Sequence, residues 1–142
     1  MPIVNNATAA AAAPFLTPWM PGPVDPGDAA VVVSVTEFSA HHRRELPGVA
    51  VNGLRMRMGW YAMPGAVGMW LWALPVAGCG GSVSVWASEE DLDRFVSLPH
   101  HVDIMRRYGD RGTVQSTTWT ADRFDRNVIL DRARSWIAGG AR

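Results

Sequence analysis

The chain has 142 residues, 48% of them hydrophobic and 18% charged, which is typical of one globular domain with a substantial core. Thirteen basic and thirteen acidic residues cancel and form no long run of one sign, so the charge pattern favours neither a nucleic-acid partner nor a membrane-surface helix. Every basic residue is arginine, and the absence of lysine excludes Schiff-base chemistry and a lysine-dependent phosphate loop. A single cysteine, Cys79, excludes an internal disulfide and a cysteine-rich metal cluster.

Two segments of the sequence bear on where in the cell the protein is expected. The stretch MPIVNNATAAAAAPFL has no basic residue ahead of its alanines and only a weakly apolar middle, unlike a secretory signal, so we expect a cytoplasmic protein. The charge-free run 59–88 is long enough to cross a bilayer, but Pro64, Pro75 and the glycines around Cys79 divide it into shorter pieces. We therefore expect no membrane span.

The composition divides the chain into three parts. Residues 1–29 are rich in alanine and proline and predict an N-terminal arm, in which Phe15 and Trp19 are large enough to pack against the domain or a neighbour. Residues 30–125 predict an α+β domain, and residues 126–142 a C-terminal helix and tail.

In chain order, residues 31–38 are β-branched and aromatic and predict the first strand. Ser39 is a candidate N-cap, and apolar residues at helical spacing predict a helix that continues to about residue 63. After Pro64 and Gly65, residues 67–74 and 81–87 predict two strands of an antiparallel hairpin.

Ser88, Glu89, Glu90 and Asp91 form a capping box that opens a second helix, which Pro99 should kink or restart. Residues 113–120 predict a last strand, and residues 126–138 a C-terminal helix. The order strand, helix, strand, strand, helix, strand predicts a ferredoxin-like βαββαβ fold, with a four-stranded antiparallel sheet and both internal helices on one face.

Alternation along these strands predicts two unlike faces. One is aliphatic and is expected beneath the helices; it comprises Val31, Val33, Val35, Val67, Met69, Leu71, Val83, Val85 and Val114. The other mixes tryptophans with hydroxyls and comprises Ser34, Thr36, Phe38, Trp70, Trp72, Ser82, Ser84, Trp86, Gln115, Thr117 and Trp119. Four tryptophans are too much apolar surface to leave in water, so we expect a second subunit, an enclosed ligand cavity, or both to cover this face.

The segment GSVSVWASEEDLDRFVSLPHHVDIMRRYGDRGTVQSTTWTADRF, with the first strand and the Pro64-Gly65 entry to the second, resembles the dimeric α+β-barrel superfamily. Within it the chain is similar to antibiotic-biosynthesis-monooxygenase-like and spheroidene-monooxygenase-like proteins. The resemblance implies a homodimer and a ligand cavity between the tryptophan-bearing face and the helix residues His101 and Met105. Members of this superfamily include cofactor-independent oxygenases, haem-binding enzymes, dehydratases and cyclases, so the resemblance leaves the reaction open.

Histidines are the candidate reactive groups. His100 and His101 follow Pro99, and the Pro-X-His pattern of the family falls on His101, which could act as a general acid/base, as an axial haem ligand, or only as a structural residue. His41 and His42 lack further metal ligands at suitable spacing, so we expect no metal site.

The sequence thus predicts a small-molecule enzyme of secondary metabolism, monooxygenase-like or cyclase/dehydratase-like, acting on an apolar aromatic, polyene or polycyclic substrate. The expected catalytic residues are His101 and His100, without a cofactor or with haem; the expected substrate-binding residues are Thr36, Phe38, Arg57, Trp70, Trp72, Ser84, Trp86, Met105, Gln115 and Trp119. The alternative is a non-catalytic homodimeric ligand-binding protein whose tryptophans form the interface core.

Overall fold

The computed structural model describes residues 13–140. The first twelve residues of the expected arm, and with them most of the stretch compared with a signal peptide, lie outside the described residues.

Four antiparallel strands form the centre of the molecule, in the spatial order β4-β5-β3-β6. Their bounds are Val31–Ala40 for β3, Ala66–Leu74 for β4, Cys79–Trp86 for β5 and Gly112–Ala121 for β6. Of these four strands, β3 comes first in the sequence and lies inside the sheet. It pairs with β5 and β6, the third and fourth of the set, as in a ferredoxin-like sheet. The predicted α+β ferredoxin-like fold class is therefore confirmed.

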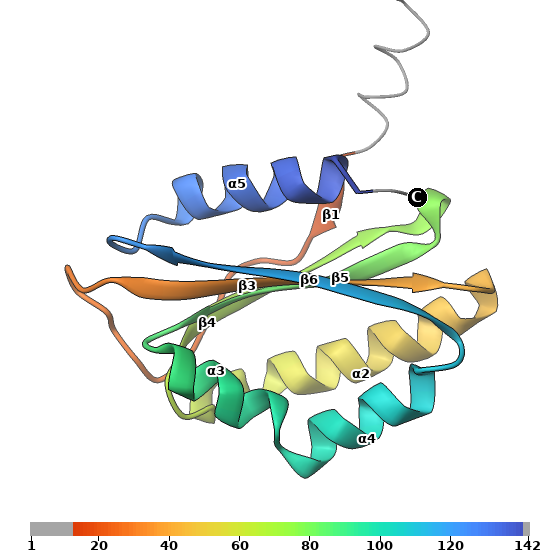
Figure 1. Cartoon of the computed structure of the whole chain (residues 1–142), viewed down its shortest axis with the longest axis horizontal. Coiled ribbons are helices and arrows are strands. Elements are labelled where there is room, and N and C mark those ends of the chain that lie inside the picture. Colours follow the sequence, from red (N-terminus) through yellow and green to blue (C-terminus); the bar gives the residue numbers. More distant parts are fainter. Residues whose placement is uncertain (1–12, 141–142) are drawn as a thin grey trace, which may run out of the picture.

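Helices cover both faces of this sheet (Figure 1). On one side lie α2 (Leu46–Met58), α3 (Glu89–Val96) and α4 (Pro99–Tyr108), and on the other lies α5 (Arg126–Ala138). The molecule thus has three layers, and the C-terminal helix covers the face that the predicted fold leaves without a helix.

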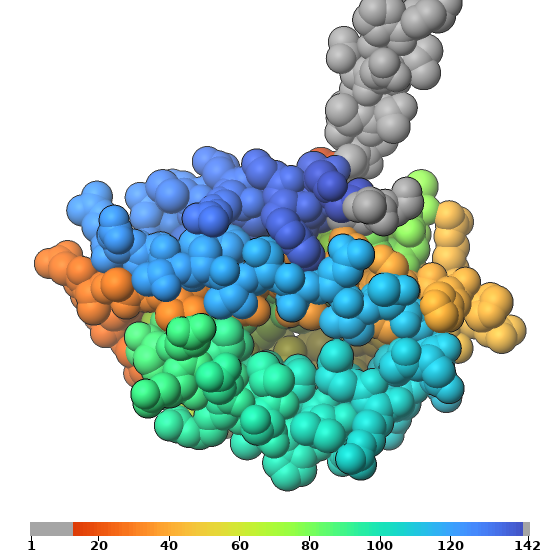
Figure 2. All heavy atoms as spheres, in the orientation of Figure 1, coloured from red at the N-terminus to blue at the C-terminus, as the bar shows by residue number. Residues whose placement is uncertain are grey.

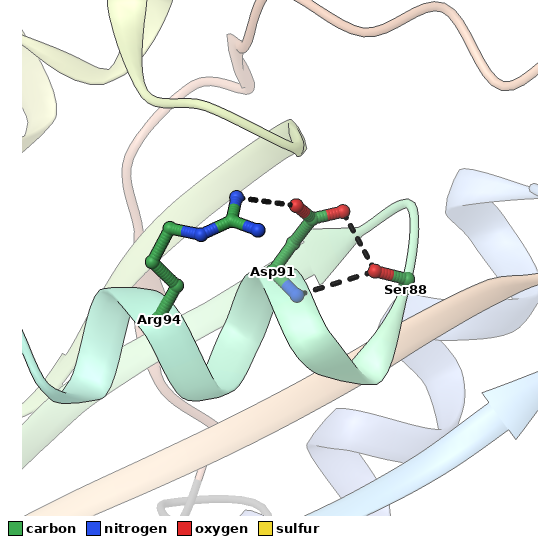
Figure 3. Close-up of polar contacts among 3 residues, drawn as sticks. All are labelled: Ser88, Asp91 and Arg94. Carbon is green, nitrogen blue, oxygen red and sulfur yellow. Dashed lines mark hydrogen bonds and ion pairs between the residues drawn. The ribbon is translucent and has the colours of Figure 1, made fainter.

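Local signals set the start of α3 and α4. The Ser88 hydroxyl accepts a hydrogen bond from the backbone N–H of Asp91 at 3.2 Å and donates to the Asp91 carboxylate at 2.8 Å, while Arg94 pairs with the same carboxylate (Figure 3). Asp91 thus binds the capping hydroxyl, in place of the expected reach back to the Ser88 backbone. Pro99 occupies the first position of α4, so it restarts the helix, since this position needs no backbone donor.

The first helix begins later than its sequence indicates. Ser39 remains in β3, where its hydroxyl donates to Glu37, and the N-cap prediction for Ser39 is wrong. A 3₁₀ turn at Arg43–Glu45 leads into α2, and a second at Trp60–Ala62 follows it. Trp60 is completely buried beneath the sheet.

The N-terminal arm packs along the free edge of β4. Two short strands, β1 (Phe15–Leu16) and β2 (Met20–Pro21), pair with it antiparallel. Between them, the Trp19 ring lies 4.4 Å from that of Trp70 and 5.4 Å from that of Phe124. The arm therefore shields backbone groups that an edge strand would otherwise leave unpaired.

The predicted division of the sheet faces is wrong in two respects. Trp70 pairs opposite Val83 and Trp119 opposite Val33, so the tryptophans of β4 and β6 share a face with the β3 valines. Met69 pairs opposite Ser84, so Met69 and Leu71 lie on the hydroxyl-bearing face. Furthermore, α2, α3 and α4 cover the hydroxyl-bearing face, and α5 covers the valine face.

The error has a definite physical source. Alternation within one strand follows from the pleat, but which faces of two strands coincide depends on their register, and a shift of one residue exchanges the faces. The register of the β4–β5 pair also shifts between Ala66 and Gly68, and no local sequence pattern predicts this shift.

Two separate cores result. The core under α5 contains β3 and β5 valines, Trp70 and Trp72, and the residues Ile129, Ala133 and Ile137, which recur every fourth position on α5. The core under the other helices is smaller and is centred on Trp60 and Trp86, with Val32, Ala66, Met69 and Leu92. The tryptophan-rich face thus obtains its cover from the same chain.

We predict opposite effects for alanine at two glycines. A Cβ at Gly68 would overlap the Trp19 indole, so Gly68→Ala should displace the arm and lower the free energy of unfolding by about 1–3 kcal/mol. At Gly53, within α2, a Cβ meets only the Leu71 methyls at 3.5 Å. Gly53→Ala should therefore raise the free energy of unfolding by about 0.5–1 kcal/mol. Urea unfolding measures both; equal effects would contradict the tight contact between the arm and β4.

Candidate functional site

A series of aromatic rings connects the sheet with α4. Trp60 lies 5.2 Å from Trp86, Trp86 lies 5.1 Å from Phe95, and Phe95 lies 4.8 Å from the His101 imidazole, measured between ring centroids. Most of these contacts are edge-to-face or tilted, the arrangements that aromatic quadrupoles favour. Packing against Phe95 thus holds the His101 ring at the inner side of the helix layer.

The sheet surface opposite these helices is rich in hydroxyl groups. Ser34 pairs with both Ser84 and Thr118, and Thr36 pairs with Ser82 and Ser116, so the hydroxyl-bearing residues of three strands form one band. The Trp86 indole donates to the Ser84 hydroxyl at 2.9 Å, which uses one of these oxygens internally. The Thr118 and Ser116 side chains on β6 are exposed although they face the helix side.

The surface is hollowed between β6 and the pair α3 and α4, as Figure 2 shows. An open surface pocket of about 380 Å³ lies against these helices, lined by Val96, His101, Val102, Met105 and Arg106. Its volume is within the range of small-molecule sites, about 300–1,000 Å³. Apolar side chains with one imidazole are suited to an apolar ligand that takes part in one proton transfer.

His101 has the most distinctive environment among these residues. Its Nδ1 atom is buried and has no hydrogen-bond partner. Burial lowers the pKa of His101 from the ordinary 6.5; the Val96 backbone opposes this, through an approach that falls short of hydrogen-bond geometry, and the neighbouring His100 adds a smaller lowering. The imidazole is therefore neutral near pH 7, as a general base requires.

A second aromatic contact lies at the other end of α4. The Tyr108 ring contacts Phe38 edge-on at 5.9 Å, and its hydroxyl accepts a hydrogen bond from the Asn52 amide at 3.2 Å. Neither Asn52 nor Tyr108 was among the predicted site residues. No local motif marks them, because their proximity depends on how α2 and α4 pack.

The predicted site residues fall into two groups. Thr36, Phe38, Ser84 and Trp86 lie on the helix-covered face, and His101 and Met105 line the pocket on α4. Trp70, Trp72, Trp119 and Gln115 lie on the opposite face, so within this chain the predicted tryptophans do not share one side of the sheet.

Two further predicted residues lie away from this pocket lining. The Arg57 guanidinium donates to the carbonyl of Pro18 at 3.0 Å and so ties α2 to the arm. His100 is exposed on α4, next to His101 in sequence.

Residues 13–140 contain no group of three or more His, Cys, Asp or Glu side chains placed to hold a metal ion. Within the same range, no helix has the length and apolar character needed to cross a membrane.

Comparison with solved structures reveals the same fold in oxygenase-like proteins. SnoaB, a cofactor-independent oxygenase from Streptomyces nogalater, is 19% identical, with a TM-score of 0.52 over 68% of this chain and 97% of its own. A candidate monooxygenase from Lactobacillus acidophilus is 14% identical, with a TM-score of 0.57 over 79% of this chain. A monooxygenase-like protein from Listeria innocua is 17% identical, with a TM-score of 0.57 over 78% of this chain.

The matches to the Lactobacillus and Listeria proteins span only 55% and 64% of those chains. No family model matches the sequence, and no curated protein does. At these identities the comparisons establish the fold, which is that of antibiotic-biosynthesis-monooxygenase-like proteins.

We predict that the His101 ring titrates below 6.5, and that Phe95→Ala moves the midpoint up toward 6.5 because water then reaches the ring. Since the unfolded chain binds this proton more readily, the free energy of unfolding should fall as the pH falls through the His101 pKa. NMR of the imidazole C–H resonances measures the midpoint, with Val128→Ala on α5 as the control. A wild-type midpoint at or above 6.5 would contradict the buried environment of His101.

Proposed function

We propose that this chain is a monooxygenase-like enzyme that needs no cofactor and binds an apolar aromatic or polycyclic substrate beside α4, with His101 as the proton acceptor. The observation that carries the proposal is a buried, unpartnered imidazole nitrogen at an apolar pocket, in a fold shared with a cofactor-independent oxygenase.

The protonation state of His101 supports the role of base. A general base must be unprotonated at the working pH, and burial keeps this imidazole neutral near pH 7. The Phe95 contact fixes the ring plane, so the proton-accepting atom has a defined position relative to a bound substrate.

The residues that line the pocket besides His101 are the basis for the proposed substrate class. Val96, Val102 and Met105 offer apolar contacts to a flat ring system. Thr36, Ser116 and Thr118 lie on the sheet face that α2, α3 and α4 cover, and their hydroxyls are suited to phenolic or carbonyl oxygens of a substrate. Arg106 is the one charged residue of the lining and would favour a substrate anion.

The reaction then needs only oxygen. When His101 removes a proton from an activated CH₂ group, the resulting electron-rich anion can reduce O₂ directly. The CH₂ carbon becomes a carbonyl that retains one oxygen atom, and the other oxygen atom leaves as water with the two hydrogens. The substrate supplies all four electrons, so the balance requires no external reductant.

We predict that the enzyme oxidises a hydroxylated anthrone to the corresponding anthraquinone with uptake of O₂, and that His101→Gln lowers kcat about 10²- to 10⁴-fold while the anthrone still binds. Absorbance of the quinone and an oxygen electrode give the rate, and fluorescence quenching gives the affinity. The matched control is Val128→Ala on α5, with wild-type kcat. Unchanged turnover in His101→Gln would refute the assigned base.

We also predict that kcat/KM, which reports ionisations of the free enzyme, rises with pH through a midpoint below 6.5 and is level near pH 7, because only neutral His101 accepts the proton. The residual activity of His101→Gln should lack this midpoint. A profile that the variant shares with the wild type would assign the titration to another group.

The other candidate functions are outcomes of the same measurements. Binding of the anthrone without turnover would indicate a ligand-binding protein, and a product formed without oxygen uptake a cyclase or dehydratase. A Soret band after purification with haem supplied would indicate haem binding through His101. The homodimer implied by the family resemblance remains a proposal, and α5 of the same chain packs on the face that carries Trp70 and Trp72.

A further inference from the structure

The outward side of α2 is apolar. Val51, Leu54 and Met58 follow one another at intervals of three and four residues, so they form one stripe along the helix, and Tyr61 continues it in the next turn. Their exposed fractions are 48%, 48%, 71% and 67%. Pro47 and Ala50, which are also exposed, extend the same side, and Arg55 is the only charged residue on it.

The inward side of the same helix is only partly apolar, with Leu46, Val49 and Met56 half-buried. It includes Asn52, which binds Tyr108, the glycines Gly48 and Gly53, and Arg57, which binds the arm. None of the thirteen residues of α2 is fully buried. A surface helix normally presents polar residues to water, so an outward side that is itself apolar marks a surface that contacts something else.

The charge around this stripe is mainly positive, because Glu45, which directly precedes α2, pairs with Arg111 at 3.3 Å. No acidic residue occurs anywhere from position 46 to position 88, whereas Arg55 and Arg57 lie on α2 and Arg43 and Arg44 precede it. The neighbouring helix α4 adds Arg106 and Arg107 against one acid, Asp103. The acids of this layer gather instead on α3, at Glu89, Glu90, Asp91 and Asp93. The zero net charge of the chain conceals this separation.

These charges distinguish two possible partners for the stripe, a second copy of the chain and a lipid surface. In a symmetric contact between two copies, the α2 of one copy would bring Arg55 toward the Arg55 of the other, with no acid on the helix to neutralise the pair. A surface of anionic lipid headgroups complements the arginines while its outer acyl region takes up the exposed apolar side chains.

We propose that the outward side of α2 docks on an anionic lipid membrane surface, with Val51, Leu54, Met58 and Tyr61 inserted at the headgroup boundary and Arg55 on the phosphates. Tyrosine at the end of the stripe fits an interfacial position, because its ring is apolar and its hydroxyl is polar. The proposal concerns the surface of the helix and holds whichever reaction the chain catalyses.

Sedimentation with lipid vesicles tests it on the full chain. The wild type should bind phosphatidylcholine vesicles containing phosphatidylglycerol, bind pure phosphatidylcholine far less, and lose binding as salt screens the arginines. Arg55→Gln should weaken the partition coefficient about fivefold. The double variant Leu54→Glu with Met58→Glu should weaken it more than about tenfold, because both apolar anchors are lost and two negative charges gained.

The control is Val128→Glu, which places an acid at a side chain 63% exposed on α5, on the other side of the sheet, and should bind like the wild type. Circular dichroism and urea unfolding establish that each variant is folded. Failure of the wild type to bind anionic vesicles, or equal binding by the double variant, would overturn the proposal. A wild-type dimer in light scattering that the double variant converts to monomer would assign the stripe to a second copy and would also overturn it.

Discussion

The register of the central strand β3 is the constraint on which the other features depend. Its pairing with β5 aligns valine with valine and serine with serine, and its pairing with β6 aligns Ser34 with Thr118 and Thr36 with Ser116, so one face of the sheet becomes largely apolar and the other rich in hydroxyls. The tryptophans of β4 and β6 then join the valines, because Trp70 pairs opposite Val83 and Trp119 opposite Val33. A shift of one residue would place these indoles among the hydroxyls and leave neither face with a uniform core.

This register explains why the sheet is covered on both sides by its own chain. The valine and tryptophan face is too apolar for water, and α5 packs on it through Ile129, Ala133 and Ile137, while the arm seals its edge with Trp19. The hydroxyl-bearing face is covered only in part, because α3 and α4 do not extend over the inward side chains of β6. A recess with an imidazole in its helix wall is therefore a consequence of unequal cover on the two faces.

In this three-layer arrangement, the aromatic core beneath α2, α3 and α4 is separate from the exposed apolar stripe on α2. The core beneath α2, α3 and α4 is small and aromatic, and it fixes His101 through Phe95. Since α2 buries none of its residues completely, its outward stripe contributes little to this core. The proposed base and the proposed lipid contact thus lie on neighbouring helices of one layer.

The sequence by itself determined the features that depend on near neighbours along the chain. The strands, the cap at Ser88, the helix restart at Pro99 and the bounds of α5 follow from turn chemistry, capping and periodicity. The Pro-X-His pattern of the family that the sequence resembles also identified His101 as a candidate. Only the tertiary structure decided which strands share a face, that α5 covers the tryptophans, that Asn52 meets Tyr108, and that the outward side of α2 is apolar. Each of these depends on register or helix packing between residues far apart in sequence, which local periodicity does not encode.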